Sequence, residues 1–309
     1  MFSKINSLFF LILLVACSSD SKSPTEVIEE PIQTEIEGYR LVFHEAFNEI
    51  RLDTNKWNTH PWWGREHSGN GSVMYYADEA IRVQGGYLHI DVHRLEDQST
   101  LPPPYNDTST WPGVLDYISG SINTHMKFSF THGIVKFRAK TAKEKGIWPA
   151  VWLIVPQQYT NVNDTWGPEI DILEMSHLYR DNPNVMGGYI YWTDKNQPQP
   201  SFHFKEEDHH LFANFTDNWH DYELRWTEDE IIFIFDNHEL LRVNRDDFAG
   251  MGNPPHSDWI ADVPMYLMIN VAVGASWMEQ DAMPDENTVF PMRDALLVDY
   301  IKVYQKIED

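Results

Sequence analysis

The chain is poor in cysteine, in positive charge and in long apolar runs. Its single cysteine, Cys17, excludes any disulfide bond within the chain. Lysine and arginine together number 23 against 47 aspartate and glutamate residues, which gives a formal net charge of −24. Nucleic acid and anionic membrane surfaces repel such a protein, so we expect neither as a partner. The same field disfavours a strongly sulfated polysaccharide unless a local basic patch, such as one with Arg65 or Arg180, overrides it.

An apolar run near the N-terminus, Leu8 to Ala16, follows Lys4 and is too short to cross a membrane. It is typical of a secretory signal peptide, which we place at residues 1–16. Leu14-Val-Ala-Cys17 resembles the lipobox of bacterial lipoproteins, whose cysteine is lipidated after cleavage. The resemblance implies a bacterial cell-envelope protein anchored through Cys17 in the outer membrane, facing the periplasm or outward. A buried structural thiol is the other interpretation of Cys17.

The remaining chain divides into a tether and one domain. Residues 17–37 are polar, rich in serine, proline, threonine and glutamate, and without periodicity, so we predict a lipidated N-terminus followed by a disordered tether. Residues 38–309 contain no second linker, internal repeat or long charge block. We therefore expect a single domain, and a monomer.

The domain also lacks any long segment with helical periodicity. Short alternating segments recur instead: Val135, Phe137 and Ala139 alternate with charged residues, and 222–226 shows the same pattern. Residues 231–235 and 240–243 flank a turn at 236–237 and predict a hairpin. The pattern predicts an all-β domain of two packed antiparallel sheets, with further strands at 87–92, 265–273 and 297–304.

Aromatic residues are abundant, at 14% of the chain with 12 tryptophans. Sugar rings stack on aromatic faces, so this abundance fits carbohydrate binding. The segment from Trp62 to Gly71 combines aromatic, glycine and hydrogen-bonding residues, and Trp63 and Arg65 are candidate sugar contacts. Alternatively, the tryptophan pair in this segment closes one end of the sandwich.

Three carboxylates, Glu169, Asp171 and Glu174, lie close together in Gly167-Pro-Glu-Ile-Asp-Ile-Leu-Glu-Met175. In a regular strand Glu169 and Asp171 share one face, and Glu174 points to the other. One extra residue at Ile172 or Leu173 brings Glu174 back to the first face. We therefore predict a β-bulge there, a feature often found beside active sites.

Paired carboxylates on one face suit glycoside hydrolysis. Retaining glycosidases need a carboxylate nucleophile and a carboxylic acid that later serves as a base, roughly 5 to 5.5 Å apart. Glu169 and Glu174 could form this pair, with Asp171 between them helping to keep one carboxyl protonated. The alternative is a solvated acidic surface, but the intervening residues are apolar, and such a strand favours acids that line a cleft.

These acids form part of a longer resemblance that runs in order through residues 40 to 305. Glu169-Ile-Asp-Ile-Leu-Glu174 resembles the bulged catalytic signature of glycoside hydrolase family 16, shared by laminarinases, agarases, porphyranases and κ-carrageenases. The other segments similar to this family are Phe47-Asn48, Leu52-Asp-Thr-Asn-Lys-Trp57, Ser119-Gly-Ser-Ile-Asn-Thr124, Phe128 to Gly133, Gly146-Ile-Trp-Pro-Ala-Val-Trp152, Ile269-Asn-Val-Ala-Val-Gly274, Pro284-Asp285, Phe290-Pro291 and Val298-Asp-Tyr-Ile-Lys-Val-Tyr304.

The resemblance implies a jelly-roll β-sandwich with an open concave substrate cleft. Glu169 would be the nucleophile, Asp171 its assisting neighbour and Glu174 the general acid and base. Trp148 and Trp277 match aromatic positions of the family and are candidate substrate contacts, as is the polar residue Asn70. Trp152 matches another aromatic position, for which we favour packing in the core.

The resemblance also implies a structural calcium ion on the convex face, with no cofactor for catalysis. Glu45, Gly86 and Asp299 match the residues that hold this ion in many members, and oxygen ligands suit Ca²⁺. A paired surface acid explains Asp299 equally well.

The substrate is a polysaccharide by this resemblance, and departures from the family pattern affect its identity. Laminarinases usually carry H-G-T-x-H-T after the catalytic strand, whereas this chain has Met186-Gly-Gly-Tyr-Ile-Tyr-Trp-Thr193. The usual G-G-N-W is Gly274-Ala-Ser-Trp277 here, and residues 102–111 form an unusual insertion. We predict an endo-acting retaining hydrolase of a β-1,3- or mixed-linkage β-glucan. The alternatives are a hydrolase of a red-algal galactan (agarose, porphyran or carrageenan), a non-catalytic glycan-binding protein, and a transglycosylase.

Overall fold

The structure is a computed structural model, and its described residues are 36–66, 70–107, 114–156, 168–176, 185–191, 201–205, 218–246, 263–276, 278 and 283–307. Within them the named elements are strands and two short 3₁₀ helices, η2 (Asp78–Ala80) and η3 (Gln98–Thr100). No helix in these ranges is long and apolar enough to cross a lipid bilayer. The predicted all-β class is confirmed, whereas Cys17 lies outside the described residues.

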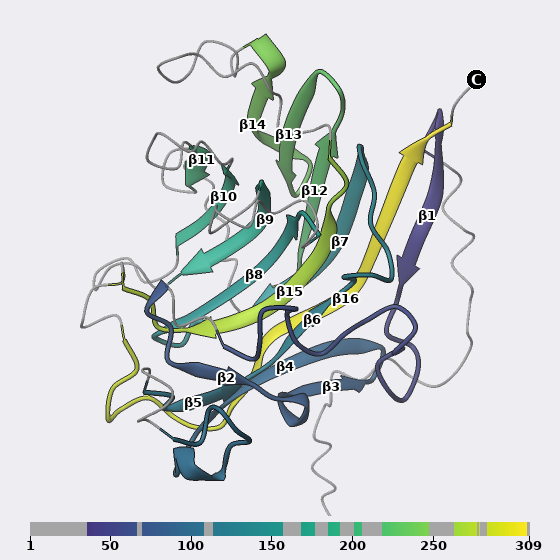
Figure 1. The fold of residues 1–309 in the computed structure, drawn as a ribbon. Coiled ribbons are helices and arrows are strands. Elements are labelled where there is room, and N and C mark those ends of the chain that lie inside the picture. The colour runs from purple at the N-terminus through teal and green to yellow at the C-terminus, as the bar shows by residue number, and fades with distance from the viewer. Residues whose placement is uncertain are drawn as a thin grey trace, which may run out of the picture.

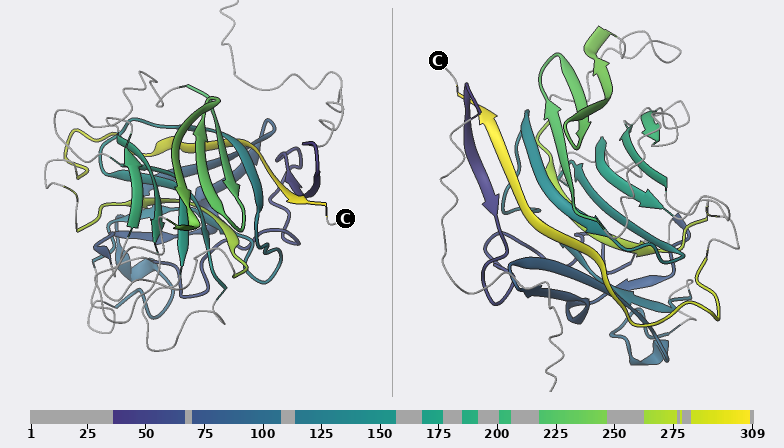
Figure 2. Two further views of the ribbon diagram at one scale, coloured as in Figure 1. Left: turned by 90° about the horizontal axis from the view of Figure 1, so that it is seen from above. Right: turned by 180° about the vertical axis from the view of Figure 1, so that it is seen from behind.

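The strands form two curved sheets that pack face to face (Figure 1 and Figure 2). The ten-stranded sheet contains, in spatial order, β14 (His238–Asn244), β13 (Glu230–Phe235), β12 (His220–Trp226), β7 (Gly133–Thr141), β16 (Met292–Lys306), β4 (Tyr87–Arg94), β5 (Tyr117–Ser119) and β2 (Met74–Tyr76), with β1 (Tyr39–Glu45) paired to β16 and β3 (Ile81–Gln84) paired to β4. The six-stranded sheet contains β11 (Ser201–Lys205), β10 (Val185–Tyr191), β9 (Glu169–Ser176), β8 (Ile147–Ile154), β15 (Tyr266–Val273) and β6 (Ser121–Asn123). The described pairs are antiparallel except for β2 with β5.

Alternation along the strands of the ten-stranded sheet separates the core from solvent. In β7, Val135, Phe137 and Ala139 are fully buried, while Lys136 and Lys140 face outward and remain partly exposed. The predicted hairpin is also present as β13 and β14. Its turn residues, Asp236 and Asn237, have φ angles of 44° and 66°, in the left-handed region that tight hairpin turns require.

Strand β15 of the six-stranded sheet is buried on both of its faces. Every residue of β15 is buried, although alternate side chains of a strand point to opposite faces. The segment after Trp57 covers part of the outer face: the side chain of Asn123 in β6 donates to the His60 carbonyl oxygen at 2.8 Å. The outer face of this sheet is therefore partly shielded from water around the centre of β15.

Candidate active site

The predicted bulge lies in β9, between Asp171 and Glu174. Against β8, Leu173 pairs with Val151 and Asp171 pairs with Trp152, which leaves Ile172 as the extra residue. Bulges add one residue to one strand of a pair and shift the faces of the residues that follow. The prediction of a bulge at Ile172 or Leu173 is confirmed.

The bulge returns Glu174 to the face that carries Asp171. The pairing of β9 with β10 likewise leaves one extra residue in β9 between Asp171 and Glu174. Ile172 and Leu173 are only 3% and 0% exposed and both belong to the hydrophobic core between the sheets. Two consecutive inward residues restore the parity, so Glu169, Asp171 and Glu174 all line one pocket on the outer face of the six-stranded sheet.

The three carboxyl groups perturb one another electrostatically. Burial raises the pKa of Asp171 well above its usual value, and the Glu169 and Glu174 charges raise it further. Burial likewise raises the pKa of Glu174, to about 8, and Glu169 adds to this rise. The Trp148 side chain opposes this rise in pKa. The three groups cannot all be ionised near neutral pH, so the pocket holds at least one protonated carboxyl beside a potential carboxylate nucleophile.

Strands β8 and β15 supply the rest of the pocket lining. Trp148, whose predicted substrate contact stays a prediction, lines it, and so does Trp152, although Trp152 is only 5% exposed and also belongs to the core. The Trp152 indole Nε1 donates to Oδ1 of Asn270 at 2.7 Å. Sequence reasoning did not single out Asn270. Its position as the polar residue of an otherwise apolar strand, within the matched Ile269-Asn-Val-Ala-Val-Gly274 segment, was the available signal.

The Trp62–Trp63 pair lies beside the pocket, against the lining residue Trp152. The Trp63 ring centroid lies 6.4 Å from that of Trp152, and Trp62 makes an edge-on contact with Trp63 at 5.5 Å. The Tyr266 hydroxyl responds to both sides of this contact: its pKa is raised mainly by burial, lowered by the Trp62 side chain and raised by the Glu169 charge. Tyr266 is therefore a further residue near the site that sequence reasoning missed, because the contact joins segments far apart in the chain.

Two other predicted substrate contacts lie away from the carboxylates. Arg65 donates through Nη1 to the carbonyl oxygen of Tyr76 and to Oδ1 of Asp78, at 2.9 and 2.8 Å, and so holds its loop against η2. Asn70 accepts hydrogen bonds from the backbone N–H and hydroxyl of Ser72, in a local turn. Within the described residues, neither lines the carboxylate pocket. Their substrate contacts stay predictions, and Trp277 lies outside the described residues.

The three residues matched to a calcium site meet at one junction of the larger sheet. Glu45 lies opposite Ile301 at the end of β1, and Gly86 immediately precedes β4. The Glu45 carboxylate already accepts from the Lys56 ammonium at 3.2 Å, and Asp299 pairs with Arg138 at 3.2 Å. Both carboxylates therefore have cationic partners already, and a Ca²⁺ ion bound here would compete with these partners for carboxylate oxygens.

Known proteins are similar to this chain over most of its length. The sequence profile of Glycosyl hydrolases family 16 matches residues 72–288. The chain is 28% identical over 293 residues to glucan endo-1,3-beta-glucosidase A1 of Niallia circulans, a match that covers 90% of this chain and 40% of that protein. It is 28% identical over 318 residues to the beta-glucanase of Rhodothermus marinus, covering 97% of this chain and 94% of that protein.

A solved structure gives the same result for the fold. The catalytic domain of an endo-1,3-beta-glucanase (laminarinase) from Thermotoga petrophila RKU-1 superposes with a TM-score of 0.67 at 30% identity, covering 87% of this chain and 99% of that domain. The expected jelly-roll sandwich is thereby confirmed. The chain spans two fifths of the Niallia protein and nearly all of the Rhodothermus protein.

Proposed function

Because the chain belongs to glycosyl hydrolase family 16, we propose that it is an endo-acting, retaining hydrolase of a β-1,3- or mixed-linkage β-glucan. The observation that carries the proposal is the bulge in β9, which gathers Glu169, Asp171 and Glu174 in one pocket. The relatives named above are glucanases, and they support glucan as the first substrate to test.

Double displacement assigns a separate role to each carboxyl group. Glu174, whose raised pKa keeps it protonated near neutral pH, donates its proton to the glycosidic oxygen while Glu169 attacks the anomeric carbon. The glycosidic bond breaks and a covalent glycosyl–Glu169 ester forms. Glu174, now a carboxylate, removes a proton from water, which attacks the anomeric carbon and releases Glu169. Asp171, in its protonated form, donates a hydrogen bond to Glu169 and so favours the ionised nucleophile.

A reducing-end release assay tests this function directly. We expect the protein to release internal oligosaccharides from laminarin or lichenan, with retention of the anomeric configuration seen by NMR early in the reaction. Absence of cleavage of any β-glycan, combined with binding of glycan by the wild-type protein, would favour a non-catalytic binding protein. Longer products formed at high acceptor concentration would indicate transglycosylation.

A red-algal galactan is the second candidate, and the altered segments around the cleft favour it. The two histidines of the H-G-T-x-H-T pattern are missing, and Gly274-Ala-Ser-Trp277 replaces G-G-N-W. The same assay on agarose, porphyran and carrageenan separates the candidates. Faster release from one of these galactans than from laminarin and lichenan would replace the glucan proposal.

The location and the calcium ion are also proposals. We expect the wild-type precursor, with lipidated Cys17, to fractionate with bacterial envelope membranes, and Cys17→Ala to release it into the soluble fraction. Continued membrane association of the variant would contradict lipidation. For calcium, a melting temperature that rises with Ca²⁺ and falls with a chelator would support the site, whereas no response in either direction would count against it.

A further inference from the structure

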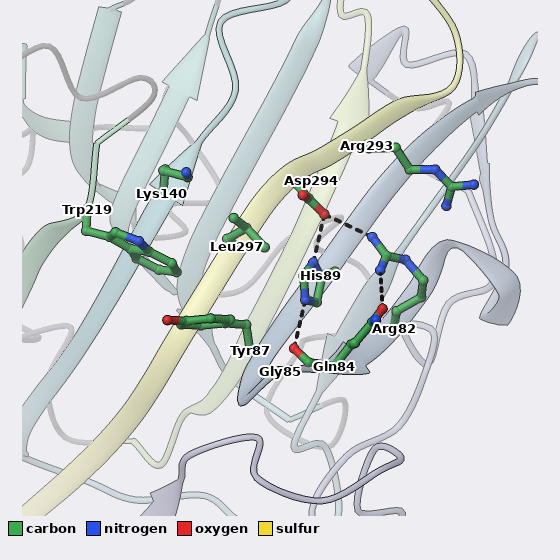
Figure 3. A pocket seen from close by; sticks show the side chains of 10 residues that line it. All are labelled: Arg82, Gln84, Gly85, Tyr87, His89, Lys140, Trp219, Arg293, Asp294 and Leu297. Atoms are coloured by element: carbon green, nitrogen blue, oxygen red, sulfur yellow. Dashed lines mark hydrogen bonds and ion pairs between the residues drawn. The ribbon is translucent and has the colours of Figure 1, made fainter. Parts of the chain in front are cut away.

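A second pocket lies on the outer face of the ten-stranded sheet, on the opposite side of the sandwich from the carboxylates. It is lined by residues of β3, β4, β7 and β16 and by Trp219, which immediately precedes β12 (Figure 3). Strand register explains how the pocket forms. Lys140 of β7 pairs with Leu297 of β16, Leu297 pairs with His89 of β4, and His89 pairs with Arg82 of β3. Residues in one row across a sheet point to the same face, so this row forms the base of the pocket.

Aromatic rings form one wall of this pocket. Tyr87 and Trp219 are stacked, with ring centroids 5.0 Å apart and an interplanar angle of 28°. Lys140 lies 5.8 Å and Arg138 5.2 Å from the centroid of the Trp219 ring. Because the stacked tyrosine covers one face of the indole, these cations lie over the other. The aromatic pair therefore presents its ring edges to the pocket, and ring edges carry positive partial charge.

Cations outnumber carboxylates around the opposite wall and the base. Arg82 pairs with Asp91 and with Asp294, each at 2.9 Å, and Arg293 pairs with Asp91 at 2.6 Å. Asp91 is fully buried beneath them, and its carboxylate holds both guanidinium groups in place. In the part of the chain that the structure describes, no carboxylate pairs with the Lys140 ammonium, which lies over the Trp219 ring. This local excess of positive charge stands out in a protein whose formal net charge is −24.

We infer that this pocket is an accessory binding site for an acidic group, a sulfate ester or a carboxylate, carried by a polysaccharide. Lys140 supplies a charge that no carboxylate among the described residues pairs with. The Arg293 guanidinium, which donates to Asp91 through Nη1, supplies further donors of the kind that bind oxyanions, and Arg82 adds positive charge although its donors already engage Asp91, Asp294 and Gln84. The edges of Tyr87 and Trp219, with Leu297 at the base, accommodate the sugar that carries the acidic group. The site would hold the protein on an acidic glycan while the cleft on the other sheet remains open. Binding here does not depend on the proposed hydrolysis, because no residue of the carboxylate pocket takes part.

Isothermal titration with matched probes tests the inference. The probes are a sulfated galactan tetrasaccharide, the same tetrasaccharide after desulfation, and inorganic sulfate, each titrated into protein carrying Glu169→Gln so that no probe is cleaved. We expect the sulfated probe to bind and Lys140→Gln to weaken it roughly tenfold, the loss of one charge-assisted contact. Lys136→Gln is the control, because Lys136 is on the same face of β7 but pairs with Glu223 at 2.9 Å outside the pocket. It should change the affinity less than about twofold.

Three results would overturn the inference. Equal weakening by Lys140→Gln and Lys136→Gln would show a general charge effect. Equal affinity for the desulfated probe would show that no acidic group is recognised. Displacement of the sulfated probe by an equal concentration of inorganic sulfate would show a site for a free anion. Fluorotryptophan NMR locates the binding: the resonance lost in Trp219→Phe should be the one that shifts with the sulfated probe, and an unchanged resonance would place the binding elsewhere.

Discussion

Asp91 and Asp171 are both buried, at 0% and 3% exposure, one in each sheet, yet their pKa values move in opposite directions. Burial alone would raise both. For Asp91, hydrogen bonds from Arg82, the Asp294 N–H and Arg293 outweigh burial and lower its pKa. For Asp171, burial and the charges of neighbouring glutamates act in the same direction and raise it.

The difference shows that neighbours, more than depth, decide what a buried acid does. Asp91, with its lowered pKa, is an anion at neutral pH and fixes two guanidinium groups on the outer face of the ten-stranded sheet. Asp171 sits among carboxyls that must share protons, which is the condition for acid and base chemistry. A buried carboxylate with cationic partners stabilises the fold, and one without them costs stability and is available for function.

The largest expected effect is a loss of hydrolysis when an acid on the outer face of the six-stranded sheet is replaced, with no such loss on the outer face of the ten-stranded sheet. Glu169→Gln removes the proposed nucleophile, and we expect hydrolysis of laminarin or lichenan to fall by on the order of 10⁴-fold while glycan binding persists. Glu223→Gln is the control, because Glu223 lies on the outer face of the other sheet and pairs with Lys136. It should leave the rate within about twofold. Similar losses in both variants would contradict the proposed role of Glu169.

Replacing Asp91 should cost stability. Its lowered pKa means that its contribution is present above the unfolded-state pKa and is lost as the pH falls through the folded-state value. We expect Asp91→Asn to lower the free energy of unfolding by about 2 kcal/mol at pH 7, less than for a fully buried pair because both arginines are partly exposed. Denaturant unfolding at pH 7 and at pH 3 measures the change, which should shrink at the lower pH.

Replacing Asp171 should change the stability in the opposite direction. A carboxyl whose folded pKa is raised destabilises the protein increasingly as the pH rises above its unfolded-state pKa and towards the folded value. Asp171→Asn removes this cost, and we expect a melting temperature higher by roughly 2–4 °C at pH 9, with a reduced rate of hydrolysis. A melting temperature lowered as much as in Asp91→Asn would show that the two acids do not differ as described.

The smallest expected effect tests the proton on Glu174. Because the pKa of Glu174 is raised to about 8, kcat/KM should decline as the pH rises through about 8 and the general acid deprotonates. The Trp148 side chain lowers this pKa, so Trp148→Phe should shift the decline to higher pH. Trp152→Phe is the matched control, because the Trp152 indole donates to Asn270 instead. An identical pH profile in the Trp148 variant and the wild-type protein would show that Trp148 does not lower the pKa of Glu174.

Local patterns predicted the features that depend on nearby residues. Alternation at Val135, Phe137 and Ala139 identified strand faces, and the apolar pair Ile172–Leu173 between acids identified the bulge. Both follow from the two-residue period of a strand, which is visible in sequence.

Features that depend on contacts between distant segments could not be predicted. Tyr266 meets Trp62, and Arg82 meets Asp294, across roughly two hundred positions of chain. Arg65 is a further example. Its place in an aromatic, glycine-rich segment suggested a sugar contact, which stays a prediction, but its ion pair with Asp78 could not be seen in the sequence. The sign of a buried acid's pKa shift, as for Asp91 and Asp171, likewise depends on partners that only the fold brings together.

The bulge in β9 also determines which kinds of mutation could abolish the site. Substitutions at Ile172 alter packing but keep the chain length, so Glu174 stays on the same face as Asp171. Deletion of Ile172 would let β9 pair regularly with both β8 and β10 and would turn Glu174 towards the apolar core, while Glu169 kept its place. In a strand of the same kind without a bulge, the acids would have to stand at every second residue to share one face. The length of this strand, as much as the identity of its acids, therefore determines whether a chain of this type can carry the site.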